Sequence, residues 1–177
     1  MEMENELNLC LKRINDERIR EWTGYWLKER TPDYFWTVPA SSTGKYHPKY
    51  AAEEGGLVRH TKVVFNIALE LLENKVWPFS KRERDLALSA ILLHDTRKLG
   101  MPKQEYTVDN HADLVADAIK EECEEGSIRW QIAELVGTHM GRWGTAEVEN
   151  ELQYFVHICD FLSSRKFLEV DFSRMGV

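Results

Sequence analysis

The chain has 177 residues, of which 43% are hydrophobic and 30% charged, with only 10 glycines and 5 prolines. This composition suits one globular domain and excludes a disordered or low-complexity protein. The formal net charge of −7 does not favour extensive binding to a nucleic-acid backbone, which depends on many Lys and Arg contacts. The three cysteines are far apart and form no CxxC pair, so neither a disulfide scaffold nor a cysteine-rich zinc site is expected.

The N-terminal segment, MEMENELNLC, is acidic and lacks the basic start of a signal peptide. The longest apolar-leaning run, Leu86–Leu93, is too short to span a bilayer. We therefore expect a cytoplasmic protein with no membrane partner.

Residues 1–30 are expected to form one N-terminal helix with a break near Gly24, because Leu7, Leu11 and Trp26 belong to a mostly helical apolar pattern. Residues 31–56 are rich in proline and glycine and are expected to form a long loop, and loops of that length usually have a function. Its aromatic residues either fix the loop to the core or supply a ring that stacks on a base or ribose of a substrate.

Residues 57–166 are expected to form the helical core, in which Ser80 and Glu83 have the spacing of a capping box before a strongly apolar helix. Residues 167–177 would be a tail. The prediction is an all-α protein, a single bundle of about six helices.

Polar residues interrupt the apolar faces of these predicted helices, and two more end the most apolar helix. They are His60, His94, Asp95, His111, His139 and Asp160. Buried carboxylates are costly unless they are paired or bound to metal. Imidazoles and carboxylates inside a helical bundle are therefore expected to hold one or two divalent cations.

The adjacent pair His94-Asp95 has two interpretations. Successive side chains on a helix diverge by about 100°. Either both residues bind the same ion where the backbone is closely packed, or Asp95 bridges two ions with its two oxygens. Paired ions of that kind activate a water molecule and orient a phosphoryl group.

Several motifs resemble the HD-domain metal-dependent phosphohydrolases over about residues 45–170. They are GGLVRHT at 55–61, HDTRK at 94–98, the histidines at 111 and 139, and HICDFLSSRK at 157–166. Residues 39–61 look most like the HD domains of bacterial 3′-to-5′ exoribonucleases and of stand-alone or phage HD proteins. The chain has no room for the additional OB domain of those exonucleases, so a nucleotide is at least as plausible a substrate as nucleic acid.

The resemblance implies roles for individual residues. The primary metal ligands would be His60, His94, Asp95 and Asp160, whereas His111 and His139 would bind a second ion with Asp95 as the bridge. The ions would be Mn²⁺, Fe²⁺ or similar. Asp95 and Lys98 would be catalytic, with Lys98 near the attacking water or the phosphate, and its alternative role is that of a solvated cation. Substrate-binding candidates are His47, Arg142 and Arg165.

The expected activity is hydrolysis of a phosphoester in a nucleotide or a short single-stranded nucleic acid by a metal-activated hydroxide. Two alternatives stay open: a metal-binding HD scaffold or sensor that does not hydrolyse, and an HD oxygenase with a di-iron site. The sequence does not indicate the oligomeric state.

Overall fold

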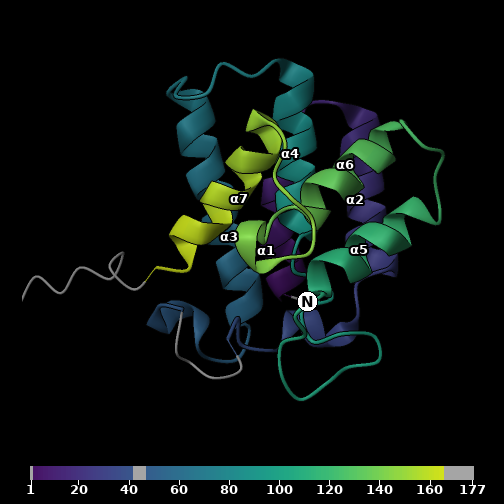
Figure 1. Cartoon of the computed structure of the whole chain (residues 1–177). Coiled ribbons are helices and arrows are strands. Elements are labelled where there is room, and N and C mark those ends of the chain that lie inside the picture. The colour runs from purple at the N-terminus through teal and green to yellow at the C-terminus, as the bar shows by residue number, and fades with distance from the viewer. Residues whose placement is uncertain (1, 42–46, 166–177) are drawn as a thin grey trace, which may run out of the picture.

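The computed structural model describes residues 2–41 and 47–165, and this part of the chain is helical and contains no strand, which confirms the all-α prediction (Figure 1). The α-helices are α1 (Glu2–Leu11), α2 (Glu17–Glu29), α3 (Gly56–Glu73), α4 (Lys81–Leu93), α5 (His111–Lys120), α6 (Ile128–Gly137) and α7 (Glu151–Ser163). The short 3₁₀ helices are η1 (Asp33–Trp36), η2 (Lys49–Ala51) and η3 (Gly141–Trp143). The predicted tail at 167–177 lies outside the described residues. None of the described helices has the length and apolar character needed to cross a membrane.

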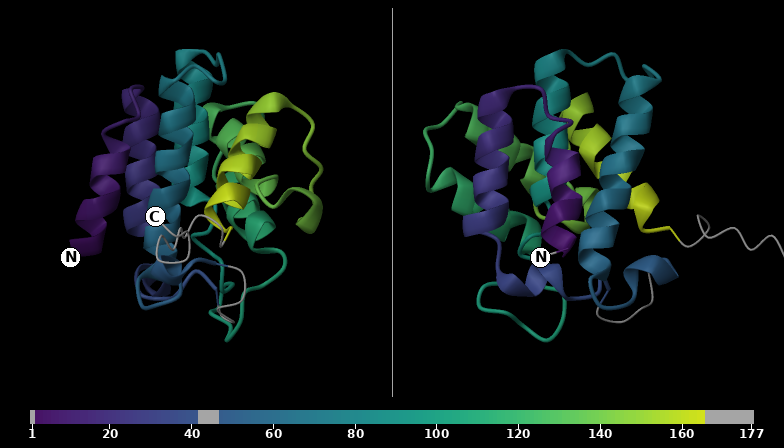
Figure 2. Two further views of the ribbon diagram at one scale, coloured as in Figure 1. Left: turned by 90° about the vertical axis from the view of Figure 1, so that its left-hand side faces the viewer. Right: turned by 180° about the vertical axis from the view of Figure 1, so that it is seen from behind.

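Helix α4 lies at the centre of the bundle. Nine consecutive residues, Asp85–Leu93, are buried, and the helix packs against α2, α3, α6 and α7. Figure 2 shows α1 and α2 on one side of α3 and α4, and α7 on the other side. The C-terminal end of α4 therefore delivers the residues that follow it into the interior.

The start of α4 follows the predicted capping box. The Ser80 hydroxyl accepts a hydrogen bond from the Glu83 amide at 3.2 Å, and the Glu83 carboxylate accepts one from the Ser80 amide at 2.8 Å. Each side chain thus satisfies a backbone donor that has no partner within the helix.

The N-terminal segment contains two helices, so the prediction of one helix with a break near Gly24 was wrong. Gly24 lies inside α2, and the break falls between α1 and α2, where Asp16 caps α2 by accepting from the amides of Arg18 and Ile19. The buried Asp85 carboxylate of α4 accepts hydrogen bonds from the amides of Asn15 (3.1 Å) and Asp16 (2.8 Å). This separation makes the described α-helices seven instead of about six.

The described part of segment 31–56 is more structured than the predicted loop. It contains η1 and η2, and Phe35 is fully buried in the core. The Tyr34 hydroxyl donates a hydrogen bond of 2.9 Å to the carbonyl of Gly100, and burial raises the pKa of Tyr34 to about 12. These two aromatic residues fix the segment to the core, next to the chain that follows α4.

Candidate metal centre

Five elements of the bundle bring the six predicted ligand-type residues into one cluster. They are His60 in α3, His94 and Asp95 directly after α4, His111 at the start of α5, His139 just after α6, and Asp160 in α7. The four histidines and Asp95 are at most 2% exposed. The Asp160 side chain is 21% exposed and lies at the one edge of the cluster that solvent reaches among these six residues.

The first half of the cluster consists of His60, His94, Asp160 and one oxygen of Asp95. His60 Nε2 lies 3.0 Å from Asp160 Oδ1 and 3.4 Å from His94 Nε2. Asp95 Oδ2 lies 3.3 Å from His94 Nε2 and 3.5 Å from His60 Nε2. Donor atoms about 2.1 Å from a common ion are separated by roughly 3–3.5 Å. The spacing of His60, His94 and Asp160 therefore fits ligands of a single cation, and Asp95 Oδ2 lies close to the two histidines of this set.

The second half of the cluster contains the other oxygen of Asp95. Asp95 Oδ1 lies 3.1 Å from His111 Nε2 and 3.7 Å from His139 Nε2. Among the described residues, these three buried atoms have no hydrogen-bond partner. Buried polar atoms are almost always satisfied, so an orphaned set that converges on one point indicates a missing ligand. The group His94, Asp95 and His139 likewise has donor atoms close enough together to hold an ion.

Three of the histidines are held in the same tautomer. The Nδ1 atoms of His94, His111 and His139 each lie 2.7 Å from the backbone carbonyl oxygen three residues earlier. A carbonyl can only accept a hydrogen bond, so Nδ1 carries the proton and the lone pair of Nε2 points into the cluster. Metal-binding histidines are oriented by outer hydrogen bonds of this kind.

His60 follows the same rule through a side chain. Its Nδ1 lies 3.1 Å from the Ser163 hydroxyl, which itself donates a 2.8 Å hydrogen bond to the carbonyl of Asp160. The Ser163 oxygen is therefore the acceptor for His60 Nδ1–H. Sequence reasoning missed Ser163, whose only signal was its position one turn after Asp160.

The charges of the cluster are unusual for a protein interior. Burial raises the pKa of Asp95, but the positive charge of Lys98 and the neighbouring His94 outweigh burial, so its pKa lies well below the usual range. Hydrogen bonding to His60 similarly outweighs burial and lowers the pKa of Asp160. Both carboxylates are therefore ionised, and a cation between them would offset the cost of burying them.

The histidines respond in two ways to this environment. Burial lowers the pKa of His139, which stays neutral and retains its lone pair. Burial also acts to lower the pKa of His60, but hydrogen bonds to Asp160 and Asp95 outweigh it and raise the pKa. A proton on His60 thus takes the place that a metal ion would occupy between these carboxylates.

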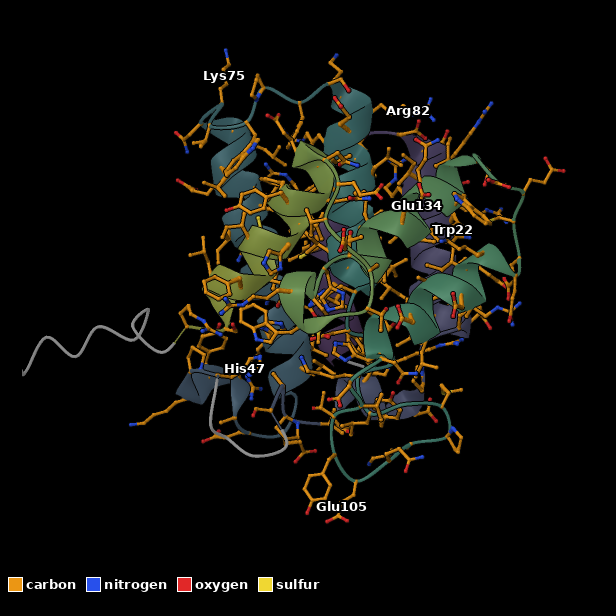
Figure 3. The ribbon with its side chains drawn as sticks, viewed as in Figure 1. Trp22, His47, Lys75, Arg82, Glu105 and Glu134 are labelled. Carbon is orange, nitrogen blue, oxygen red and sulfur yellow. The ribbon has the colours of Figure 1, made fainter. Side chains whose placement is uncertain are left out.

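Lys98 and His47 border the cluster. The Lys98 ammonium forms an ion pair with Asp95 Oδ2 at 2.5 Å. The His47 ring lies edge-on to the His60 ring, with centroids 4.9 Å apart, and burial lowers the pKa of His47 to about 3. Figure 3 shows His47 at the end of the bundle opposite to Lys75 and Arg82. The structure thus places both predicted residues next to the candidate ligands.

Arg142 and Arg165 lie over aromatic rings outside the cluster. The guanidinium carbon of Arg142 is 4.4 Å from the ring centroid of Trp143, and that of Arg165 is 4.3 Å from the ring centroid of Phe161. The structure does not bring either arginine among the candidate ligands.

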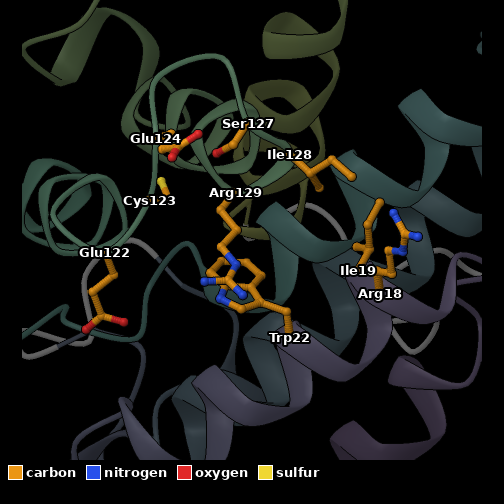
Figure 4. A pocket seen from close by; sticks show the side chains of 9 residues that line it. All are labelled: Arg18, Ile19, Trp22, Glu122, Cys123, Glu124, Ser127, Ile128 and Arg129. Atoms are coloured by element: carbon orange, nitrogen blue, oxygen red, sulfur yellow. The ribbon is translucent and has the colours of Figure 1, made fainter.

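A separate surface groove of about 440 Å³ contains none of the cluster residues (Figure 4). It lies between α2 and the turn that joins α5 to α6, where the Arg129 guanidinium lies 5.8 Å from the ring centroid of Trp22. Glu122 and Glu124 give the same groove negative charge, so it has no single electrostatic character.

The fold and the cluster define an all-helical protein with a buried histidine–aspartate centre that could hold a metal ion. Residues 57–165, more than half of the chain, match the HD domain, so the chain belongs to the HD-domain family. The comparisons found no curated protein and no solved structure similar enough to count as a relative.

Proposed function

We propose that this protein is a metal-dependent phosphohydrolase that cleaves the phosphoester of a nucleotide. The observation that carries the proposal is the convergence of the histidine Nε2 atoms on the two oxygens of a buried, ionised Asp95. Membership of the HD-domain family supports the same activity.

The donor set fits one or two first-row divalent ions, and its four imidazoles favour Mn²⁺ or Fe²⁺ over Mg²⁺. His60, His94 and Asp160 would hold one ion and His111 and His139 the other, with one Asp95 oxygen on each side. Bound there, the metal would supply a Lewis acid and lower the pKa of a coordinated water.

The protein's own residues would position the phosphoester. Asp160 lies at the exposed edge of the cluster, so a phosphate would approach from the side of α7. The Lys98 side chain is 10% exposed, and its ammonium beside Asp95 would stabilise the charge that develops on phosphoryl oxygens. The His47 ring packs against the His60 ring and would help to exclude water from the reacting group.

A small substrate agrees with the charge of the chain. With a net charge of −7, the protein lacks the excess of cations that binding of a long phosphate backbone requires. A mononucleotide, or the end of a short single strand, demands only local positive charge such as that of Lys98.

The test is Asp95→Ala, because this substitution removes an oxygen from both halves of the cluster. Manganese-loaded protein is given nucleoside phosphates, cyclic nucleotides and short RNA and DNA, and the products are identified by mass spectrometry. We expect products with the wild type, none with Asp95→Ala, and a lower metal content in the variant.

Asp113→Ala is the matched control, because the Asp113 carboxylate accepts hydrogen bonds from Thr145 and lies outside the cluster. It should retain both activity and metal. Full activity of Asp95→Ala would contradict the proposed site. Bound metal with no product from any substrate would instead favour a scaffold, and products that require iron and oxygen would favour an oxygenase.

A further inference from the structure

An aromatic and cationic surface lies just outside the metal centre. The rings of Trp143 in η3 and Phe161 in α7 are nearly parallel, at 11°, with centroids 5.8 Å apart. The Arg142 guanidinium lies over the first ring and that of Arg165 over the second. We call these four residues, Arg142, Trp143, Phe161 and Arg165, the aromatic platform.

The platform exposes aromatic surface that other parts of the chain bury. Trp143 is 50% exposed, whereas Trp26 in the core is 1% exposed. Tyr154, one turn before His157 on α7, is 47% exposed and adds a third accessible ring beside the platform. A large exposed ring contributes little to folding, and clustered apolar surface of this kind marks binding sites.

The backbone connects the platform directly to the candidate metal ligands. Phe161 follows Asp160 in α7, and Trp143 lies four residues after His139. The His157 ring contacts both platform rings, with centroids 6.2 Å away in each case, and its Nδ1 donates to the carbonyl of His139 at 2.7 Å. A ligand on the platform would therefore lie next to the edge of the cluster that Asp160 opens to solvent.

Resting on the proposed function, we infer that the aromatic platform binds the planar base of a nucleotide whose phosphate reaches the metal centre. Bases stack on aromatic side chains whatever their sequence, and guanidinium planes both stack on bases and pair with phosphate. Two parallel rings with an arginine over each provide this combination. A simple sugar phosphate would use the phosphate site but gain less from such flat π surfaces.

The experiment compares two ligands that differ only in the base. They are the methylene phosphonate analogues of adenosine 5′-monophosphate and of ribose 5-phosphate, which contain no phosphoester to hydrolyse. Isothermal titration calorimetry on manganese-loaded protein gives both dissociation constants. Stacking of one base predicts at least about fivefold tighter binding of the adenine-containing ligand to the wild type.

Trp143→Ala should reduce that ratio to near one, and Trp143→Phe should retain part of it because a smaller ring remains. The control is Tyr25→Ala, since Tyr25 is another exposed aromatic residue, 45% exposed, with the Arg30 guanidinium 5.9 Å from its ring centroid. That variant should keep the wild-type ratio. An equal or undetectable affinity for the two analogues in the wild type, or an unchanged ratio in Trp143→Ala, would overturn the inference.

Two further measurements extend the experiment. The first asks whether the base belongs to a strand end or to a mononucleotide, and the second separates base binding on the platform from phosphoester hydrolysis. A phosphorothioate oligodeoxyadenylate of four nucleotides that binds tighter than the mononucleotide analogue would identify a strand end as the source of the base, and weaker binding would identify the mononucleotide. Phosphate release from adenosine 5′-monophosphate and ribose 5-phosphate is measured in parallel. Trp143-dependent binding without phosphate release would leave the platform standing and contradict hydrolysis. Equal hydrolysis of both compounds by wild type and Trp143→Ala would support the proposed hydrolysis and contradict base binding on the platform.

Discussion

Asp95 joins the two halves of the candidate metal centre, and Lys98 forms an ion pair with it. The ammonium pairs with the same oxygen, Oδ2, that faces His60 and His94. Lysine provides no lone pair when protonated, so Lys98 is not itself a metal ligand. In the proposed function it would instead contact an oxygen of a bound phosphoryl group.

Lys98→Met should therefore separate metal binding from turnover. We expect the metal content to stay close to the wild-type value, while kcat falls by roughly 10²–10³, the usual effect of losing one group that stabilises transition-state charge. Metal analysis and initial rates of phosphate release on the same preparation measure both quantities.

The matched control is Lys103→Met, because Lys103 is exposed and lies over the Tyr34 ring, away from the carboxylates. It should retain the wild-type rate. If Lys98→Met also keeps that rate with metal bound, then Lys98 only neutralises Asp95.

The candidate ligands themselves could be predicted from the sequence, because each is a polar residue on an apolar helix face or at the end of an apolar helix. The outer hydrogen bonds could not. Ser163 contacts His60 although the two residues are 103 positions apart in the sequence. His157 contacts the carbonyl of His139 only because α7 passes the turn that follows α6. Such contacts depend on how whole helices pack, which local spacing does not encode.

At the scale of elements, the centre is built from helix ends. His94 and His139 follow the last residues of α4 and α6, and each donates Nδ1–H to a carbonyl in the preceding helical turn. This hydrogen bond fixes each ring with its Nε2 toward the cluster.

The turn after α6 holds His157 and His139 together, and Gly141 makes that turn possible. Gly141 has φ of +54°, and an added Cβ would lie 2.5–2.8 Å from three atoms of the His157 ring. Gly141→Ala should displace His157 and with it the carbonyl of His139. We expect lower metal content and a loss of unfolding free energy greater than the 1–2 kcal/mol or so of left-handed strain alone.

Gly126→Ala provides the matched comparison for metal analysis and urea unfolding. Gly126 also has a positive φ, +76°, but an added Cβ would meet no atom within 4 Å. It should lose only the strain energy, about 1–2 kcal/mol, and keep its metal. Equal losses of stability in the two variants, with metal retained in both, would show that the contact with His157 does not position His139.

The break between α1 and α2 shows why element boundaries were harder to predict than element type. Asn15-Asp16-Glu17 has the residue types of a helix N-terminus, so a local signal was present. The apolar pattern nevertheless continues across it, because Ile14 before the cap and Ile19 after it are both buried. What fixes the break is Asp85, 69 residues away from Asp16, and no local pattern contains that contact.

At the scale of the molecule, the candidate metal centre gathers residues from α3, α5 and α7 and from the ends of α4 and α6, so a cation bound there would connect most of the bundle. The ionised Asp95 and Asp160 stay buried together, and without metal the positive charges of Lys98 and of a protonated His60 offset them. A bound cation would replace the His60 proton between the two carboxylates. A ligand that binds only the folded state adds to stability by mass action. The stability of the whole fold should therefore depend on the metal.

We expect Mn²⁺ at 100 times its dissociation constant to raise the free energy of unfolding by about 2.7 kcal/mol, and excess chelator to remove that increment. Urea unfolding with and without metal measures it. Asp95→Ala should lose the increment, because both halves of the cluster lose a ligand.

Asp85→Ala distinguishes this linkage from general destabilisation. Asp85 is also a buried aspartate and lies in α4, but it accepts from the amides of Asn15 and Asp16 rather than facing the histidines. Leaving those donors unsatisfied should lower stability by about 2–3 kcal/mol in chelator and in metal alike. The metal increment should persist in this variant because its cluster is intact. An increment that disappears equally in both variants would mean that the ion does not bind between Asp95 and the histidines.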